Sequence, residues 1–132
     1  MRLSLLGVFL TVGLAFAGKE EKFKLINVSQ LVEQVGKVDS KPNIFDANND
    51  DTRKKDGAIP GAKLLSSFDE YNVSKELPAS KDASLVFYCA NTHCMASHAA
   101  AERAVDAGYT HVAVMADGIQ GWKKAGQKTA TP

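Results

Sequence analysis

The fold of this chain is decided by one stretch, Leu85-Val86-Phe87-Tyr88-Cys89-Ala90-Asn91-Thr92-His93-Cys94-Met95-Ala96-Ser97-His98. It begins with a continuous apolar run, typical of a strand in the middle of a sheet that is covered on both faces. The run ends at Cys89, a polar loop follows, and an alanine-rich helix is expected over Ser97–Ala107. Both cysteines and two of the three histidines lie in this stretch, so covalent chemistry is expected at this turn.

Strands and helices alternate around this stretch. A short amphipathic helix is expected over Ser29–Val35, with Ser29 as its N-cap and Gly36 at its end. Further strands are expected at Asn43–Asp46, Lys63–Leu65 and His111–Met115, and further helices within 67–76 and over Gly118–Ala125, whereas 47–56 is expected to be a polar loop with room for one helical turn. The alternation predicts an α/β layer fold with a mainly parallel central sheet flanked by helices. Ligands of such sheets bind beyond the carboxyl ends of the strands, which is where Cys89 lies.

The first 17 residues have the pattern of a secretory signal peptide. The positive start Met1-Arg2 precedes the apolar run Leu3–Phe16, and Ala15-Phe16-Ala17 predicts cleavage after Ala17. The alternative is an uncleaved N-terminal anchor. Cleavage would leave residues 18–132, the length of a single domain, in the periplasm or secreted, with no stable membrane association. The last five residues, Lys128–Pro132, are expected to be a solvated tail.

The net charge and the two cysteines limit the kinds of binding partner and the compartment that can be expected for this chain. Removal of residues 1–17 takes away Arg2 and leaves 15 basic and 15 acidic residues. This balance provides no charge surplus for binding nucleic acid or an anionic membrane. Export would place both thiols where disulfides persist. A bridge between Cys89 and Cys94 would close a small loop and stabilise the fold less than a long-range bridge, so a local structural disulfide is one interpretation of the pair.

Five segments, in order along roughly Ser29 to Gly126, resemble the rhodanese-like (sulfurtransferase) domain family. They are Ile44-Phe45-Asp46-Ala47, Asp56-Gly57-Ala58-Ile59-Pro60-Gly61-Ala62, Val86-Phe87-Tyr88-Cys89, Ser97 with Ala99-Ala100-Ala101 and Ala107-Gly108-Tyr109, and Met115-Ala116-Asp117-Gly118-Ile119-Gln120-Gly121-Trp122. The resemblance implies the family's three-layer fold. It also implies a small sulfur donor, a thiol acceptor and no cofactor.

The chain departs from the family pattern in several places. Ala58 stands where the family turn has histidine, Asn48 where arginine usually follows the first strand, and Asp117 where a glycine is usual. Ser97 lies eight residues after Cys89 rather than about six. The loop between them has no lysine or arginine and contains Cys94 instead.

The resemblance assigns the chemistry to Cys89. A cysteine at a strand end that faces a helix N-terminus meets unpaired N–H groups and the positive end of the helix dipole, which stabilise a thiolate. By resemblance, Cys89 attacks the outer sulfur of a donor, carries it as a persulfide and passes it on. Cys94 would resolve the persulfide or a sulfenate by forming a disulfide. The substrate-binding loop would consist of Ala90, Asn91, Thr92, His93, Met95, Ala96 and Ser97, with Asp46 and Arg53 in supporting positions; Arg53 would supply the missing positive charge.

Two other interpretations remain open from the sequence, and a third is disfavoured. Cys89, His93, Cys94 and His98 form a set of soft ligands that suits Cu(I) or Zn(II), which would make the domain a thiol–disulfide or metal-binding module. The missing loop arginine and the altered turn at Ala58 also fit a catalytically inactive interaction protein. A phosphatase of the cysteine-loop type is disfavoured, because Met95 and Ala96 stand where its phosphate-binding arginine is needed.

Overall fold

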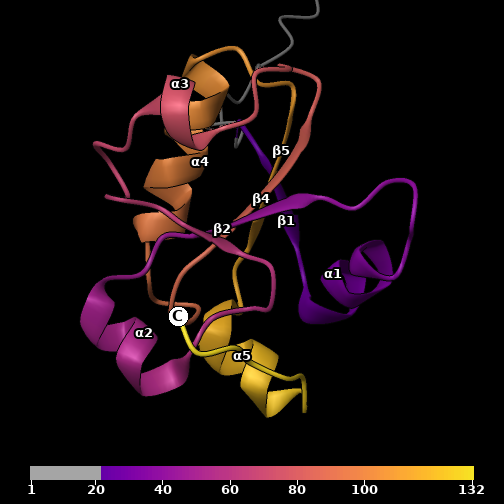
Figure 1. Cartoon of the computed structure of the whole chain (residues 1–132), viewed down its shortest axis with the longest axis vertical. Coiled ribbons are helices and arrows are strands. Elements are labelled where there is room, and N and C mark those ends of the chain that lie inside the picture. Colours follow the sequence, from indigo (N-terminus) through magenta and orange to yellow (C-terminus); the bar gives the residue numbers. More distant parts are fainter. Residues whose placement is uncertain (1–21) are drawn as a thin grey trace, which may run out of the picture.

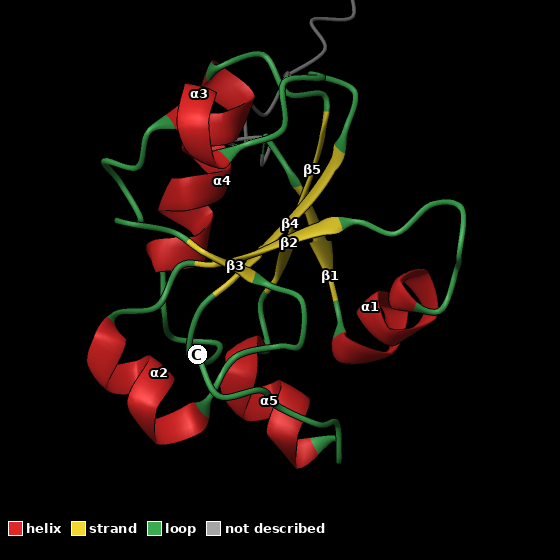
Figure 2. Cartoon of the chain, viewed as in Figure 1, coloured by secondary structure: helices red, strands yellow, loops and turns green. Residues whose placement is uncertain are grey.

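A five-stranded parallel sheet forms the centre of the molecule (Figures 1 and 2). The computed structural model describes residues 22–132, so the predicted signal peptide lies outside the described residues. The strand order is β1-β5-β4-β2-β3, and every neighbouring pair is parallel. The strands are β1 (Lys24–Ile26), β2 (Asn43–Asp46), β3 (Lys63–Leu64), β4 (Ser84–Tyr88) and β5 (His111–Met115). All the carboxyl ends therefore meet at one edge of the sheet, as the predicted α/β fold requires.

Helices cover both faces of this sheet. They are α1 (Val28–Val35), α2 (Asp50–Asp56), α3 (Val73–Glu76), α4 (Ala96–Asp106) and α5 (Gly118–Lys124). On one face, alanines of α4 pack with Phe45 and Phe87 in a buried cluster. On the other, Leu31 of α1 and Trp122 of α5 belong to a second buried cluster. The prediction of a central sheet flanked by helices is confirmed.

Alternation along β4 decides which way the site faces. Val86 and Tyr88 belong to the cluster under α1 and α5, whereas Phe87 and Cys89 belong to the cluster under α4. Because successive side chains of a strand point to opposite faces, Cys89 follows Phe87 onto the α4 side. Both faces of β4 are buried because α4 covers one and α1 and α5 cover the other, while β5 and β2 pair with its two edges.

Several local predictions need correction. Helix α1 begins one residue early because Asn27, not Ser29, is the N-cap: Asn27 Oδ1 accepts from Gln30 N (2.9 Å), and Gln30 Oε1 accepts from Asn27 N (2.8 Å). The stretch 47–56 contains a seven-residue helix, α2, capped by Asn49 Oδ1, which accepts from Thr52 N at 2.9 Å. Its acidic first turn and basic last turn complement the helix dipole.

The two ends of the described chain are also tied into the fold. Strand β1, which the sequence analysis did not predict, pairs with β5. The predicted solvated tail is exposed except at the half-buried Ala130, but it is attached to the fold: Ala130 forms an antiparallel bridge with Ala58, and the carbonyl of Lys128 accepts a hydrogen bond from Trp122 Nε1 at 2.8 Å. No helix within residues 22–132 has the length and apolar character needed to cross a membrane.

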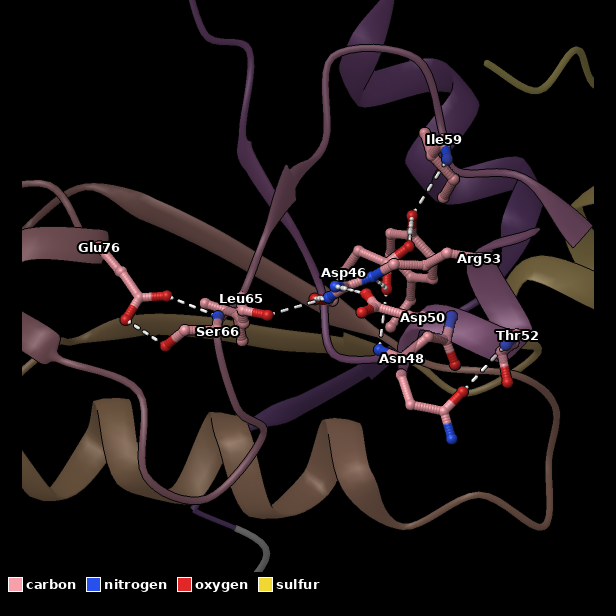
Figure 3. A network of polar contacts seen from close by, with 11 residues as sticks. Asp46, Asn48, Asp50, Thr52, Arg53, Ile59, Leu65, Ser66 and Glu76 are labelled. Atoms are coloured by element: carbon pink, nitrogen blue, oxygen red, sulfur yellow. Dashed lines mark hydrogen bonds and ion pairs between the residues drawn. The ribbon is translucent and has the colours of Figure 1, made fainter. Parts of the chain in front are cut away.

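Only α3 is helical within the 67–76 region, and Glu76 fastens this region to the end of β3 (Figure 3). Its carboxylate accepts hydrogen bonds from Ser66 N (2.7 Å), Ser66 Oγ (2.8 Å) and Asn72 N (2.7 Å). Partial burial opposes ionisation, but these hydrogen bonds from Ser66 and Asn72 outweigh it and lower the pKa of Glu76. The folded state therefore binds the proton less readily than the unfolded chain does.

We expect Glu76→Gln to lower the free energy of unfolding by about 1 kcal/mol at pH 7, because charge-assisted hydrogen bonds are lost. A carboxyl group whose pKa is lowered by folding contributes stability above its unfolded value, and that contribution is lost as the pH falls through the folded value. Urea unfolding should therefore show the difference shrinking below about pH 4. Glu70→Gln, at an exposed neighbouring position, is the control. A difference that persists unchanged at pH 3 would contradict this account.

Candidate active site

Cys89 lies directly after the last residue of β4, at the carboxyl edge of the sheet. It is 1% exposed and faces the start of α4. Its Sγ atom lies 3.3 Å from Ser97 Oγ, on the first turn of α4, and 3.3 Å from the carbonyl oxygen of Cys94. Ser97 is itself 1% exposed. The expected juxtaposition of the strand-end cysteine and a helix N-terminus is therefore present.

Cys94 is joined to Cys89 in a disulfide, with the two Cα atoms 6.2 Å apart. The sequence is compatible with this bridge but does not require it. Cys94 is only partly buried, and its neighbours His93 and Met95 are exposed, Met95 to 61%. The bridge thus joins a fully buried residue to a partly buried one that packs against the same cluster.

The loop between the cysteines is shaped by Asn91. The Asn91 carbonyl accepts from Cys94 N (3.1 Å), and its side-chain Oδ1 accepts from His93 N (3.0 Å). Asn91 Nδ2 lies 3.3 Å from Gln120 Oε1. An asparagine that bonds its own following backbone closes a tight turn, which keeps Cys94 close to Cys89.

The start of α5 supports the loop from the following crossover. Ile119 N donates to the Cys89 carbonyl (2.8 Å), and Gln120 N donates to the Ala90 carbonyl (3.0 Å). Gly118 has φ +66°, and a Cβ there would lie 2.4 Å from the Ala90 carbonyl carbon. These residues were not among the predicted site residues. The only sequence signal for them is the Asp117-Gly118-Ile119 run within the resembled closing segment.

Asp117, one of the departures from the family pattern, has a structural role. Its Oδ2 accepts a hydrogen bond from Val28 N (3.1 Å), the first residue of α1. The side chain thereby links the β5–α5 connection to the helix that follows β1.

A buried polar network links the ends of β2 and β4 (Figure 3). The fully buried Asp46 carboxylate accepts from Tyr88 Oη (2.6 Å), Asn48 N (2.8 Å) and Arg53 Nε (3.3 Å). Tyr88 Oη in turn accepts from Ile59 N at 3.0 Å. Burial, together with the Asp46 charge and hydrogen bond, strongly raises the pKa of Tyr88, so its phenol stays protonated and donates to Asp46.

The family to which this fold belongs is found by comparison with known proteins. The profile of the rhodanese-like domain family matches residues 27–125. The chain belongs to the rhodanese-like domain family. The predicted family, and the roughly Ser29 to Gly126 span proposed for it, are thereby confirmed. None of the curated protein sequences is significantly similar to this rhodanese-like domain.

Solved structures of the family share its fold. A rhodanese-like domain from Anabaena sp. is 19% identical with a TM-score of 0.65, and the match covers 81% of this chain and 80% of that one. A rhodanese-like domain protein from Staphylococcus aureus is 24% identical with a TM-score of 0.60, covering 82% and 99%. A thiosulfate sulfurtransferase from Pseudomonas aeruginosa is 21% identical with a TM-score of 0.61, covering 80% of this chain and 20% of that longer one. At these identities the three matches show a shared fold.

In this rhodanese-like domain, the two predicted supporting residues lie beside the site rather than in the loop. The guanidinium of Arg53 bonds to Asp46, to Asp50 and to the carbonyl of Leu65. Neither Asp46 nor Arg53 forms a hydrogen bond with loop residues 90–97 in the described structure, so they reach the site through Tyr88, the neighbour of Cys89. Asn48, in the family's arginine position, is buried, and its Nδ2 has no hydrogen-bond partner among the described residues.

The four residues of the metal-binding interpretation do not form a ligand set. Within residues 22–132 no group of three or more His, Cys, Asp or Glu side chains is arranged to hold a metal ion. The His98 ring packs edge-on against Phe23 with centroids 5.4 Å apart, and His93 is exposed. Both cysteine sulfurs are used in the bridge.

Proposed function

We propose that this rhodanese-like domain transfers sulfane sulfur as a persulfide on Cys89 and that Cys94 can release that sulfur by forming the Cys89–Cys94 disulfide, which a thiol reductant then returns to the dithiol. The observation that carries the proposal is the position of Cys89 Sγ, at the end of β4, facing the first turn of the 11-residue helix α4 and within bonding distance of Cys94. Helix N-termini stabilise thiolates. The Ser97 hydroxyl, 3.3 Å from Cys89 Sγ, is placed to donate to such a thiolate.

The proposed reaction starts from the reduced pair. The Cys89 thiolate attacks the outer sulfur of a donor such as thiosulfate, the donor's S–S bond breaks, and sulfite leaves with the electron pair. The outer sulfur of the resulting Cys89 persulfide then passes to a thiol acceptor. Alternatively, the Cys94 thiolate attacks Cys89 Sγ, which forms the Cys89–Cys94 disulfide and expels hydrosulfide. Each step exchanges one S–S bond for another and needs no cofactor.

The same proposal assigns the loop and the location. The exposed residues between Cys89 and Ser97 would contact the donor, with the Asp46–Arg53–Tyr88 network holding the strand end in place. The predicted signal peptide would place the single domain, residues 18–132, in the periplasm or outside the cell, where a protein disulfide persists.

Loading with thiosulfate tests this function. The reduced protein should gain the mass of one sulfur atom at Cys89, and Cys89→Ser should gain none. The matched variant Cys94→Ser should load and then keep the sulfur longer, because the internal resolving thiol is missing. The parent should release one hydrosulfide per disulfide formed, measured without external thiol. If Cys89→Ser accepts sulfur as readily as the parent does, the proposal fails, and an inactive domain would be indicated if neither protein loads.

A further inference from the structure

The two sulfurs of the bridge differ in their accessibility. Cys89 is 1% exposed and belongs to the buried cluster between the sheet and α4. Cys94 is partly exposed, between His93 and Met95, which are both exposed. A thiolate that reduces a disulfide must approach the attacked sulfur in line with the S–S bond, on the side away from the leaving sulfur. Cys89 is enclosed by the cluster and leaves no route for that approach, whereas the partly buried Cys94, which packs against the cluster, is the residue of the two that solvent reaches.

The leaving groups differ in the same sense. Attack on Cys94 expels Cys89 as a thiolate, next to the Ser97 hydroxyl and the first turn of α4. Attack on Cys89 would expel Cys94 from the exposed turn held by Asn91. Because the better-stabilised thiolate leaves faster, accessibility and leaving-group chemistry both favour attack on Cys94.

We infer that Cys94 is the sulfur at which a dithiol reductant attacks the resting disulfide, and that this attack releases Cys89 as the free thiolate. One thiolate of the reductant bonds to Cys94 Sγ, and the Cys89–Cys94 bond breaks with the electron pair on Cys89. The second thiolate of the reductant then attacks the reductant's own sulfur in the mixed disulfide and expels the Cys94 thiolate. The domain gains two electrons and the reductant becomes a disulfide.

A dithiol suits this site better than a monothiol. Its second thiol is held near the mixed disulfide at a high effective concentration, so it clears Cys94 without a second encounter. The stretch Ala90–Ala101 contains no Asp or Glu, so the segment that carries Cys94 has no carboxylate that would repel a thiolate. The inference rests on the proposed function in one respect: the proposed function is the reason why Cys89 would need to be freed by reduction.

The regiochemistry is testable on the oxidised full protein without any sulfur donor. Brief reaction with 2-mercaptoethanol, followed by acid quenching, alkylation and fragment mass spectrometry, should place the mercaptoethanol adduct on Cys94 and the alkyl group on Cys89, with at least a tenfold preference. Dithiothreitol should reduce the bridge fully and leave no lasting adduct.

An adduct on Cys89, or an equal division between the two sulfurs, would overturn the inference. A lasting dithiothreitol adduct on Cys94 would overturn the inference that the second thiol of a dithiol clears Cys94. The outcome is independent of sulfur loading, which uses protein that is already reduced. An adduct on Cys94 in a protein that never accepts sulfur would therefore reject the proposed function and leave this inference standing.

Discussion

Arg53→Met is expected to lower the free energy of unfolding by about 3–5 kcal/mol, because it removes one partner of a buried ion pair. Arg53 is 8% exposed, and Asp46 is fully buried. The substitution takes away the donor 3.3 Å from Asp46 Oδ1 and the donor that serves the carbonyls of Asp46 and Leu65, each at 3.0 Å. Methionine fills part of the space but leaves a buried charge and two carbonyls without these bonds.

Urea unfolding of the oxidised protein measures this cost, and two comparisons separate charge from packing. Lys22→Met breaks the surface pair with Asp106, in which the side chains are 57% and 64% exposed, and should cost less than about 1 kcal/mol. Asp46→Asn added to Arg53→Met should recover part of the loss, since no buried charge remains unpaired. Equal costs for Arg53→Met and Lys22→Met would show that the buried pair is not a main source of stability.

The same ion pair explains why α2 was not predicted as a full helix. Periodicity identifies a helix by its apolar stripe, but the buried side chains of α2 are the charged residues Arg53 and Asp56. Their burial is compensated by pairing with Asp46 and with Lys123, whose Nζ lies 3.2 Å from Asp56 Oδ1. Asp46 lies seven residues before Arg53, at the end of the preceding strand, and Lys123 lies 67 residues after Asp56, so neither pairing appears as a periodic pattern within α2. By contrast, β4 and α4 were predicted almost to the residue, because a continuous apolar run and an alanine-rich segment act locally.

In the candidate site, too, the features set by local sequence could be predicted and those set by distant contacts could not. The position of Cys89 at a strand end, and its nearness to Cys94, could be predicted because both depend on the 85–98 stretch alone. The hydrogen bonds of Ile119 N and Gln120 N to the Cys89 and Ala90 carbonyls could not be predicted. They are contacts between backbone atoms, so they leave no pattern of side chains in the sequence. They also depend on how the segment after β5 is placed against the segment after β4.

Gly118→Ala is expected to cost about 3 kcal/mol or more and to abolish sulfur loading at Cys89. A methyl group at this position meets the Ala90 carbonyl carbon at 2.4 Å, its oxygen at 2.5 Å and Asn91 N at 2.6 Å. All three atoms belong to the backbone of the cysteine loop, which cannot yield by rotating a side chain. The loop and α5 must therefore separate, which breaks the hydrogen bonds from Ile119 N and Gln120 N. Two such bonds contribute about 1 kcal/mol each.

The left-handed backbone conformation of Gly118 adds a separate cost to the free energy of unfolding, and Gly126 provides a control for that cost. Gly118 has φ +66°, and Gly126, just beyond α5, has φ +79° with nothing within 4 Å of its added Cβ. Gly126→Ala should therefore show the conformational cost alone, about 1–2 kcal/mol, and should load sulfur normally. Urea unfolding and thiosulfate loading of both variants isolate the contact between α5 and the loop. If the two substitutions have equal effects, that contact does not hold Cys89 in its reactive position.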